Sequence, residues 1–316
     1  MKNNFTNFID ILIIQYINKR LIMQLVVSER IDKKLADGII TKAEYDEFAN
    51  FVETLNNEFM THDVITNNEY CNWYANGDLS VEHVKHFVIQ FSVFSNLFLI
   101  AQLKKVINAD TIEESRESKE ILMNELGVIF NSGKTTPVNV VDKEREGDPD
   151  IVSTEGTVEK GIFKFRASHF EWLVQMGKHF GLQFNQMGKR KHGTESTLFF
   201  CDELERIYAS PDYNEAQGAS FAVENWAADG FWSQLVDGFS KFKKEQMPKL
   251  PLAFFTWHDK VEAQHKEHTM HELEETYFDD RFQKEPFIKA GKEMLDGTNA
   301  FWVGLNKDRL AEELTV

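Results

Sequence analysis

Hydrophobic residues recur with helical spacing along almost the whole chain. Near the N-terminus, Phe5, Phe8 and Leu12 lie three or four positions apart, which is the spacing of one face of an α-helix. Stretches with the strict alternation of a half-buried strand are few, and the chain has only six prolines. The pattern therefore predicts an all-α protein. Helices are expected near residues 5–24, 28–36, 42–60, 79–108, 112–130, 160–187, 197–209, 218–245, 252–278, 284–296 and 300–314.

We expect residues 1–60 to form an N-terminal helical extension packed on a helical domain of residues 61–316, because no linker divides the apolar helices. Gly38 is expected to end one helix of the extension, and Thr41 with Glu44 forms a capping-box pattern that begins the next. Residues 131–161 make the one clear break in composition, being rich in charge, Gly and Pro. This segment is predicted to be an exposed polar insertion.

The net charge of the chain limits the kinds of molecule that it is expected to bind. The chain has 51 acidic and 35 basic residues, a formal net charge of −16, which repels phosphate backbones and anionic lipid surfaces. Nucleic-acid binding is therefore not expected. Two cysteines, Cys71 and Cys201, cannot make a disulfide framework and lie in no C-x-x-C pair. These features favour a reducing, cytoplasmic location.

No membrane span is expected. The N-terminal residues lack an early cluster of positive charge and a small-residue cleavage site, so they are interpreted as an amphipathic helix. The most apolar stretch, residues 87–103, is uncharged but contains Gln90, Ser92 and Asn96 and is shorter than the ~20 residues of a span. A buried bundle helix is predicted there.

Four of the ten histidines fall within residues 252–271. On a helix, His258, Glu262 and His265 lie within an arc of about 60°. Two imidazoles and a carboxylate are a ligand set that iron, manganese or zinc accepts. The alternative to a metal site is that these three residues form an ordinary polar face of the helix. His268 and His271 lie off the arc and are not expected to be ligands.

A buried metal site in a helical bundle needs carboxylates and imidazoles from neighbouring helices. Glu224 lies in a segment that is otherwise uncharged, where a lone carboxylate is costly to bury unless it is paired or ligated. Glu125 lies in another apolar run, and His169 begins a helical pattern. The ferritin-like alternative needs two Glu-x-x-His pairs, and only Glu262 with His265 supplies one on a suitable face.

This set resembles the haem-oxygenase-like diiron oxidase and oxygenase family. Ligands in that family come as an early Glu and His, a single Glu on a middle helix, and His-x3-Asp/Glu-x2-His on a late helix. The matching residues here, in order, are Glu125 and His169, then Glu224, then His258, Glu262 and His265. The resemblance covers roughly residues 80–296 and implies a haem-oxygenase-like multi-helix bundle.

The early pair departs from the family pattern. Glu125 and His169 are 44 positions apart, where the family has a short kinked connection, and the extra length is the polar insertion. Glu120 and Glu171 are therefore kept as alternatives for the early Glu. By contrast, 55 positions from His169 to Glu224 and 34 from Glu224 to His258 suit ligands on successive long helices.

The resemblance implies two iron ions, with manganese as an alternative, and O2 and a small-molecule substrate as partners. Relatives use O2 for N-oxygenation, oxidative C–C cleavage or decarboxylation of amines, amino acids or fatty acids. Glu224 is the candidate for a bridging carboxylate, because carboxylates change binding mode readily as metal charge changes. Whether the protein forms a homodimer is left open.

Aromatic residues near the proposed ligands predict a water-poor substrate pocket, although core packing explains them equally well. The candidates are Trp226, Phe231 and Trp257, with Trp232, Phe254 and Phe255 beside them.

Two other functions stay open. A thiaminase-like hydrolase on the same scaffold would need a nucleophilic cysteine, and Cys201, after two phenylalanines, is interpreted as a structural thiol. A metal-free helical ligand-binding or interaction protein is the second alternative, because a fold does not fix a function.

Overall fold

The computed structural model describes residues 24–131, 162–165 and 167–313, and in the helix that carries His258 it leaves the side chains of residues 261–268 undescribed. The helix expected at 5–24 and the insertion of residues 131–161 thus fall almost entirely outside the described residues. The described chain is predominantly helical, so the predicted all-α class is confirmed. The first helices are α2 (Glu29–Ala36), α3 (Lys42–Glu58), α4 (Asp63–Thr66), α5 (Glu69–Asn76), α6 (Val81–Asn108) and α7 (Ile112–Glu125). After the strands β1 (Val128–Asn131) and β2 (Ile162–Phe165) come α8 (His169–Lys178), α9 (Glu195–Glu203), α10 (Tyr213–Ala228), α11 (Phe231–Glu245), α12 (Ala253–Tyr277) and α13 (Lys284–Glu313).

The helix signals read from the N-terminal part are confirmed. Ser28 caps α2, and Gly38 follows that helix with a φ of 70°, a left-handed conformation that glycine adopts without strain. Thr41 and Glu44 form the expected capping box at the start of α3. The buried face of α3 packs Phe48 and Phe51 against aromatic rings that follow α12 and begin α13.

The predicted helix pattern is wrong in three places. The helix expected at 218–245 is two helices, α10 and α11, because Gly230 with a φ of 86° breaks the run. The two helices expected at 284–296 and 300–314 are one continuous helix, α13. The helices expected at 112–130 and 160–187 are shorter, because residues 128–131, at and just beyond the end of the first range, form β1 and pair antiparallel with residues 162–165 of the second range, which form β2.

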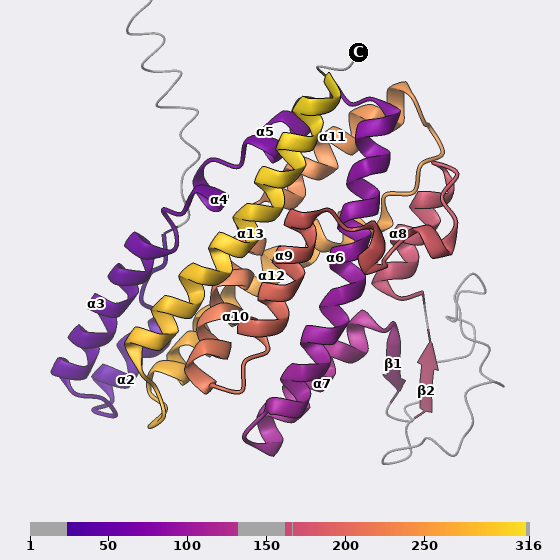
Figure 1. Cartoon of the computed structure of the whole chain (residues 1–316). Helices are drawn as coiled ribbons and strands as arrows, with labels where there is room; N and C mark the ends of the chain where they lie inside the picture. Colours follow the sequence, from indigo (N-terminus) through magenta and orange to yellow (C-terminus); the bar gives the residue numbers. More distant parts are fainter. Residues whose placement is uncertain (1–23, 132–161, 166, 314–316) are drawn as a thin grey trace, which may run out of the picture.

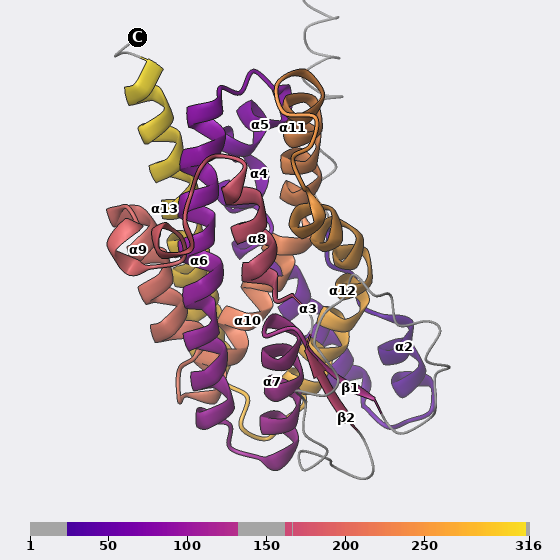
Figure 2. The same cartoon turned by 90° about the vertical axis from the view of Figure 1, so that its right-hand side faces the viewer.

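Figures 1 and 2 show how the long helices are arranged. Helix α13 lies along α10, α9 and α5 (Figure 1). Helix α7 folds back along α6, and α8 lies between α6 and α12 (Figure 2). Aromatic rings packed at tilted angles fill the interior, among them Phe87, Phe239 and Phe255. The fold thus brings α7, α8 and α12 together beside the central helix α6.

Helix α6 is, among the described helices, the one long and apolar enough to cross a membrane by length and composition. Half of its most apolar stretch is buried inside the protein. A buried helix of a protein core passes the same test, so this single helix is weak support for a span. Two of its buried polar side chains donate hydrogen bonds inside the fold: Gln90 to the His192 carbonyl, and Gln102 to the Tyr208 hydroxyl.

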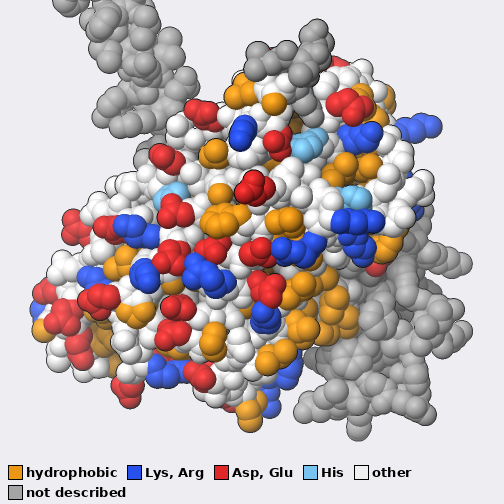
Figure 3. All heavy atoms as spheres, in the orientation of Figure 1, with side chains coloured by type: hydrophobic (Ala, Val, Ile, Leu, Met, Phe, Trp, Pro, Cys, Tyr) orange, Lys and Arg blue, Asp and Glu red, His pale blue; other side chains and the backbone are white. Residues whose placement is uncertain are grey.

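The outer surface carries both signs of charge. On the face shown in Figure 3, acidic and basic side chains alternate without a continuous basic area. Among the described surface residues, Arg206 pairs with Glu203 and Glu293. Exposed pairs of this kind contribute about 0–1 kcal/mol each to the stability of a fold.

The close crossing of α10 and α13 generates a stability prediction. A Cβ added to Gly218 would lie 2.1 Å from the Phe287 carbonyl oxygen, a backbone atom that cannot move without shifting α13. We expect Gly218→Ala to lower the free energy of unfolding by about 1–3 kcal/mol, measured by denaturant unfolding. The control is Gly297→Ala in α13, where the nearest atoms to the added Cβ belong to side chains, Glu203 at 3.1 Å and Met294 at 3.5 Å. It should change stability by less than about 1 kcal/mol, because alanine's better helix propensity offsets the contact. Equal losses in both variants would contradict the close crossing.

Candidate metal centre

Three residues that are far apart in the sequence converge at one point of the fold. Glu125 ends α7, His169 begins α8, and His258 lies in the second turn of α12. One ligand atom from each lies within 4.8 Å of the others. Three of the six predicted ligands are therefore brought together, and we call them the triad.

The two-stranded ribbon explains how Glu125 and His169 meet across 44 positions. Val128 pairs with Phe165, and Asn131 pairs with Ile162. Glu125 precedes the first pair by three residues, and His169 follows it by four. The chain therefore leaves and returns side by side, and the insertion does not separate the two residues in space. Ser168 caps α8 through the backbone N–H of Glu171, which fixes His169 in the first turn.

His169 is buried and oriented by its neighbours. Its Nδ1 lies 3.1 Å from Glu125 Oε2, and an ionised carboxylate can only accept a hydrogen bond. Nδ1 therefore carries the proton in this contact, and Nε2 keeps its lone pair. Trp257 and Trp172 flank the ring, with centroids at 4.6 Å and 5.3 Å.

His258 is held in the tautomer that metal ligands use. Its Nδ1 lies 2.7 Å from the carbonyl oxygen of Phe254. Because a carbonyl accepts and never donates, Nδ1 must be protonated, which leaves Nε2 of a neutral ring as the atom able to bind a metal. A backbone carbonyl on the distal nitrogen is a common way to orient a metal-binding histidine. Trp232 stacks on the ring at 4.6 Å with an interplanar angle of 17°.

The donor set fits a divalent cation. Two neutral imidazoles and one carboxylate, if all bound one ion, would match the ligand types of non-haem iron(II) sites. The carboxylate gives the cluster a negative charge, and a cation would offset the cost of keeping three polar groups next to aromatic rings. The alternatives for the early Glu do not share this position: Glu120 and Glu171 are exposed, and neither belongs to the triad.

The remaining predicted ligands lie in two places. The side chains of Glu262 and His265 are outside the described residues. The helical register of α12 puts their positions on the stripe that runs from His258 to Thr269. Glu224 is half-buried on α10 and, together with Thr269, lines a cavity. The described residues therefore do not bring Glu224 into the triad.

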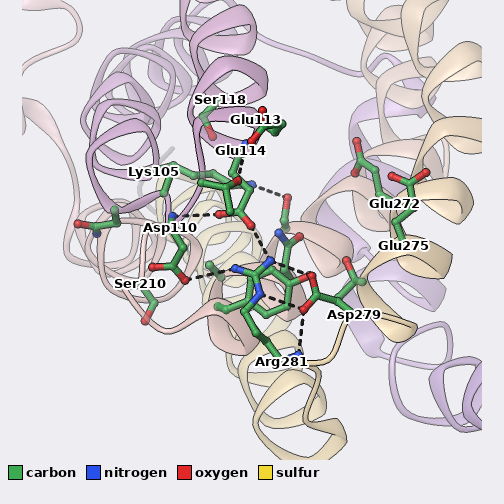
Figure 4. A pocket seen from close by; sticks show the side chains of 18 of the residues that line it. Lys105, Asp110, Glu113, Glu114, Ser118, Ser210, Glu272, Glu275, Asp279 and Arg281 are labelled. Carbon is green, nitrogen blue, oxygen red and sulfur yellow. Dashed lines mark hydrogen bonds and ion pairs between the residues drawn. The ribbon is translucent and has the colours of Figure 1, made fainter.

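That cavity has a volume of about 610 Å³ and lies among the C-terminal end of α6, α7, α10 and α12 (Figure 4). Each flanking helix contributes one stripe of side chains spaced three or four residues apart. The stripes are Glu114, Ser118 and Ile121 on α7, Tyr213, Gln217, Ser220 and Glu224 on α10, and Thr269, Glu272 and Thr276 on α12. The α7 stripe continues to Glu125, and the α12 stripe leads back to His258. The cavity and the triad thus share two helix faces.

Charges at the cavity are mostly acidic. Arg281 is bound by Asp110, Glu114 and Asp279, and its hydrogen bonds lower the pKa of Asp279 to about 2. Lys105 donates to the Ser220 hydroxyl at 2.9 Å and lies 4.4 Å from the centre of the Tyr208 ring. Burial raises the pKa of Tyr208, and the nearby charge of Glu224 acts in the same direction.

The predicted substrate-pocket residues divide between the triad and the core. Trp257 borders the triad and is 38% exposed. Trp226 and Phe231 stack on each other at 4.5 Å and are buried, with Trp302 5.5 Å from Phe231. The sequence interpretation missed Trp172 and Lys105. Trp172 could have been found from its position one helical turn after His169, whereas nothing in the sequence links Lys105 to a cavity.

The sequence matches no family model, and no curated protein matches it. Assignment of the site therefore rests on geometry and on the resemblance of its ligand pattern.

The triad predicts which early glutamate binds metal. Glu125→Gln preserves shape but removes the charge and one ligand oxygen of the site. We expect the affinity for iron(II) to fall by at least about tenfold, because substitutions one shell further out already cost about 10- to 100-fold. Anaerobic titration of the apoprotein with ferrous ion measures this.

Two variants serve as charge-matched controls, Glu120→Gln and Glu171→Gln. Both side chains are exposed, and iron affinity should stay within about twofold of the parent, as is usual for surface substitutions. Loss of iron in either control, with normal binding by Glu125→Gln, would move the early ligand to that residue.

Proposed function

We propose that the protein is a non-haem diiron oxidase or oxygenase of the haem-oxygenase-like kind, which activates O2 to oxidise a small organic substrate. The observation that carries the proposal is the convergence of Glu125, His169 and His258 from three separate helices. The order of all six candidate ligands along the chain supports it by resemblance. Oxidation of an amine, amino acid or fatty acid is the reaction class that the resemblance suggests.

The three residues of the triad would hold one metal ion, and the three other candidate ligands would hold the second ion. His169 and His258 offer Nε2, and Glu125 offers a carboxylate oxygen or orients His169 through the hydrogen bond to Nδ1. Glu224, Glu262 and His265 are the candidates for the second ion, with Glu224 as the bridge. Iron bound there would supply electrons to O2; manganese is the alternative metal.

The protein's own contribution is orientation and exclusion of water. Trp232 stacks on His258, and Phe254 lies 4.3 Å from the same ring. Trp172 and Trp257 cover His169. Aromatic rings around the imidazoles keep them in one orientation and lower the local dielectric, which protects a reactive oxidant from water. The exposed edge of Trp257 is a side from which small molecules could enter.

The thiaminase-like alternative is disfavoured by the state of the thiols. Cys201 is buried in α9, and burial raises its pKa to about 12. Cys71 is fully buried in α5. A nucleophilic cysteine needs a thiolate at neutral pH, and neither residue belongs to the triad.

One observation favours the metal-free binding protein as a second candidate. The contact between His169 and Glu125 is a complete hydrogen bond that needs no cation. A satisfied His–Glu pair beside a cavity would suit a protein that binds a ligand without chemistry.

Iron loading followed by O2 exposure tests the proposed function. Anaerobic ferrous titration should give two ions per chain, and O2 should be consumed faster with a pool of amines, amino acids and fatty acids whose mass changes are read out. His265→Ala should lose about half of the iron, since it removes a ligand of one ion only. His271→Ala should retain both, because residue 271 lies off the ligand arc. If both variants bind iron like the parent, the late triplet is not a metal site.

Hydrogen exchange distinguishes the metalloprotein from the metal-free binder. Binding of a cation by the triad would neutralise its carboxylate and tie α12 to α7 and α8, so we expect the backbone amides of residues 252–271 to become much better protected when iron(II) binds. Amides of α3, which carries none of the proposed ligands, provide the internal control and should not change. Equal protection of residues 252–271 in both states would favour the metal-free protein.

A further inference from the structure

The tryptophans of the chain belong to one connected set of aromatic rings that begins at the triad. Trp172 and Trp257 contact each other with ring centroids at 6.0 Å, and both flank His169. Trp257 and Trp232 both contact the ring of His258, at 4.9 Å and 4.6 Å. Three of the six tryptophans are therefore in direct contact with the two imidazoles. The six are Trp73, Trp172, Trp226, Trp232, Trp257 and Trp302.

From the triad, a line of rings crosses the core and reaches the surface at α5. Trp232 contacts Phe231 at 4.4 Å, and Phe231 contacts Trp302 at 5.5 Å. Trp302 contacts Tyr70 at 5.8 Å, and Tyr70 contacts Trp73 at 5.4 Å. The first four rings are buried, whereas Trp73 is partly exposed. We call these five rings the aromatic line.

Two indoles in the middle of this route have an unusual environment. The Nε1 atoms of Trp226 and Trp302 are buried and have no hydrogen-bond partner in the described part of the chain, although a buried indole N–H usually finds one. Trp226 stacks on Phe231 at 4.5 Å and lies 6.3 Å from Trp302. An indole that has lost an electron is a strong acid at Nε1, but without an acceptor it keeps that proton. The electron vacancy therefore stays mobile instead of becoming trapped on these rings.

We infer that the aromatic line is an electron relay, which delivers electrons one at a time from Trp73 to the triad when iron oxidised there by O2 has no substrate to oxidise. The source of the oxidising equivalents rests on the proposed function, whereas the line itself rests on the ring contacts. Among aromatic side chains, indole and phenol give up an electron most readily. In each step a ring gives one electron to the group nearer the triad and takes one from the ring behind it. The core is thus restored after every electron, and the loss of charge appears at the surface.

Trp73 is suited to be the surface end of the relay. The guanidinium carbon of Arg309 lies 4.5 Å from the centre of its ring. A positive charge at this distance disfavours a second positive charge on the indole, so oxidised Trp73 releases its Nε1 proton to water. The neutral radical then takes a hydrogen atom, one electron with one proton, from a small thiol in solution. Two such events produce two thiyl radicals, which combine into a disulfide.

Photochemical oxidation of the metal-free protein tests the relay. Lys260 is exposed on α12, one helical turn after Trp257, and both native cysteines are buried. Lys260→Cys can therefore be labelled selectively with a ruthenium photo-oxidant. After illumination with a soluble electron acceptor, peptide mass spectrometry should find oxidised Trp73 well above the level given by the same photo-oxidant free in solution. Trp302→Phe should lower the oxidation of Trp73 to that free-oxidant level, because phenylalanine is too difficult to oxidise to pass the electron on.

The matched control is Trp172→Phe, the same replacement beside the triad but outside the aromatic line. It should leave the oxidation of Trp73 at or above the parent level, because it removes only a competing ring. Tyr70→Phe keeps the ring and its packing and should also lower the oxidation of Trp73, so the relay stays testable if circular dichroism shows that Trp302→Phe alters the fold. Oxidation confined to Trp172 and Trp257 in the labelled parent would overturn the relay. Parent-level oxidation of Trp73 in both line variants would do the same.

The measurement uses no iron. A negative result would therefore leave the ferrous titration, and with it the proposed function, to be judged separately.

Discussion

The antiparallel pairing of β1 with β2 is the constraint on which the candidate metal centre depends. It holds the end of α7 against the start of α8, so that Glu125 and His169 lie in hydrogen-bond contact. Without the ribbon, the ends of a long segment would have to be brought together against the entropy of an open loop. The pairing of four residues on each side offsets that cost and fixes the positions of Glu125 and His169 relative to each other.

Around the triad, the protein combines polar donors with an aromatic shell. Burying an imidazole is costly unless its nitrogens have partners. Phe254 supplies one through its carbonyl for His258, and Glu125 supplies one for His169. Both contacts use Nδ1 and leave Nε2 for a further partner. The stacking of Trp232 restricts rotation of the His258 ring, so the same neighbours that fill the core also aim the ligand atom.

The triad and the cavity form two ends of one arrangement. The same faces of α7 and α12 pass from an aromatic end, where the imidazoles lie, to a polar end lined by carboxylates and hydroxyls. Glu224 lies at the polar end, near Lys105 and Tyr208, where a π-helical turn (Leu204–Tyr208) ends with Tyr208. Turns of this type are frequent at functional sites.

The sequence by itself determined the helical class and the capping of α3, and it named the residues of the triad among its candidates while leaving Glu120 and Glu171 open as alternatives to Glu125. The periodicity of the hydrophobic residues shows which face of each helix is buried. The capping box of Thr41 with Glu44 and the hydrogen bond of His258 with Phe254 each join residues that lie within one or two helical turns. The tertiary structure alone decided that Val128 and Phe165 pair, since a short apolar run continues a helical pattern as readily as it forms a strand. It also decided that Trp232 and Trp172 cover the histidines and that Lys105 faces a cavity. These contacts join residues from different helices, and only the packing of those helices determines which of them meet.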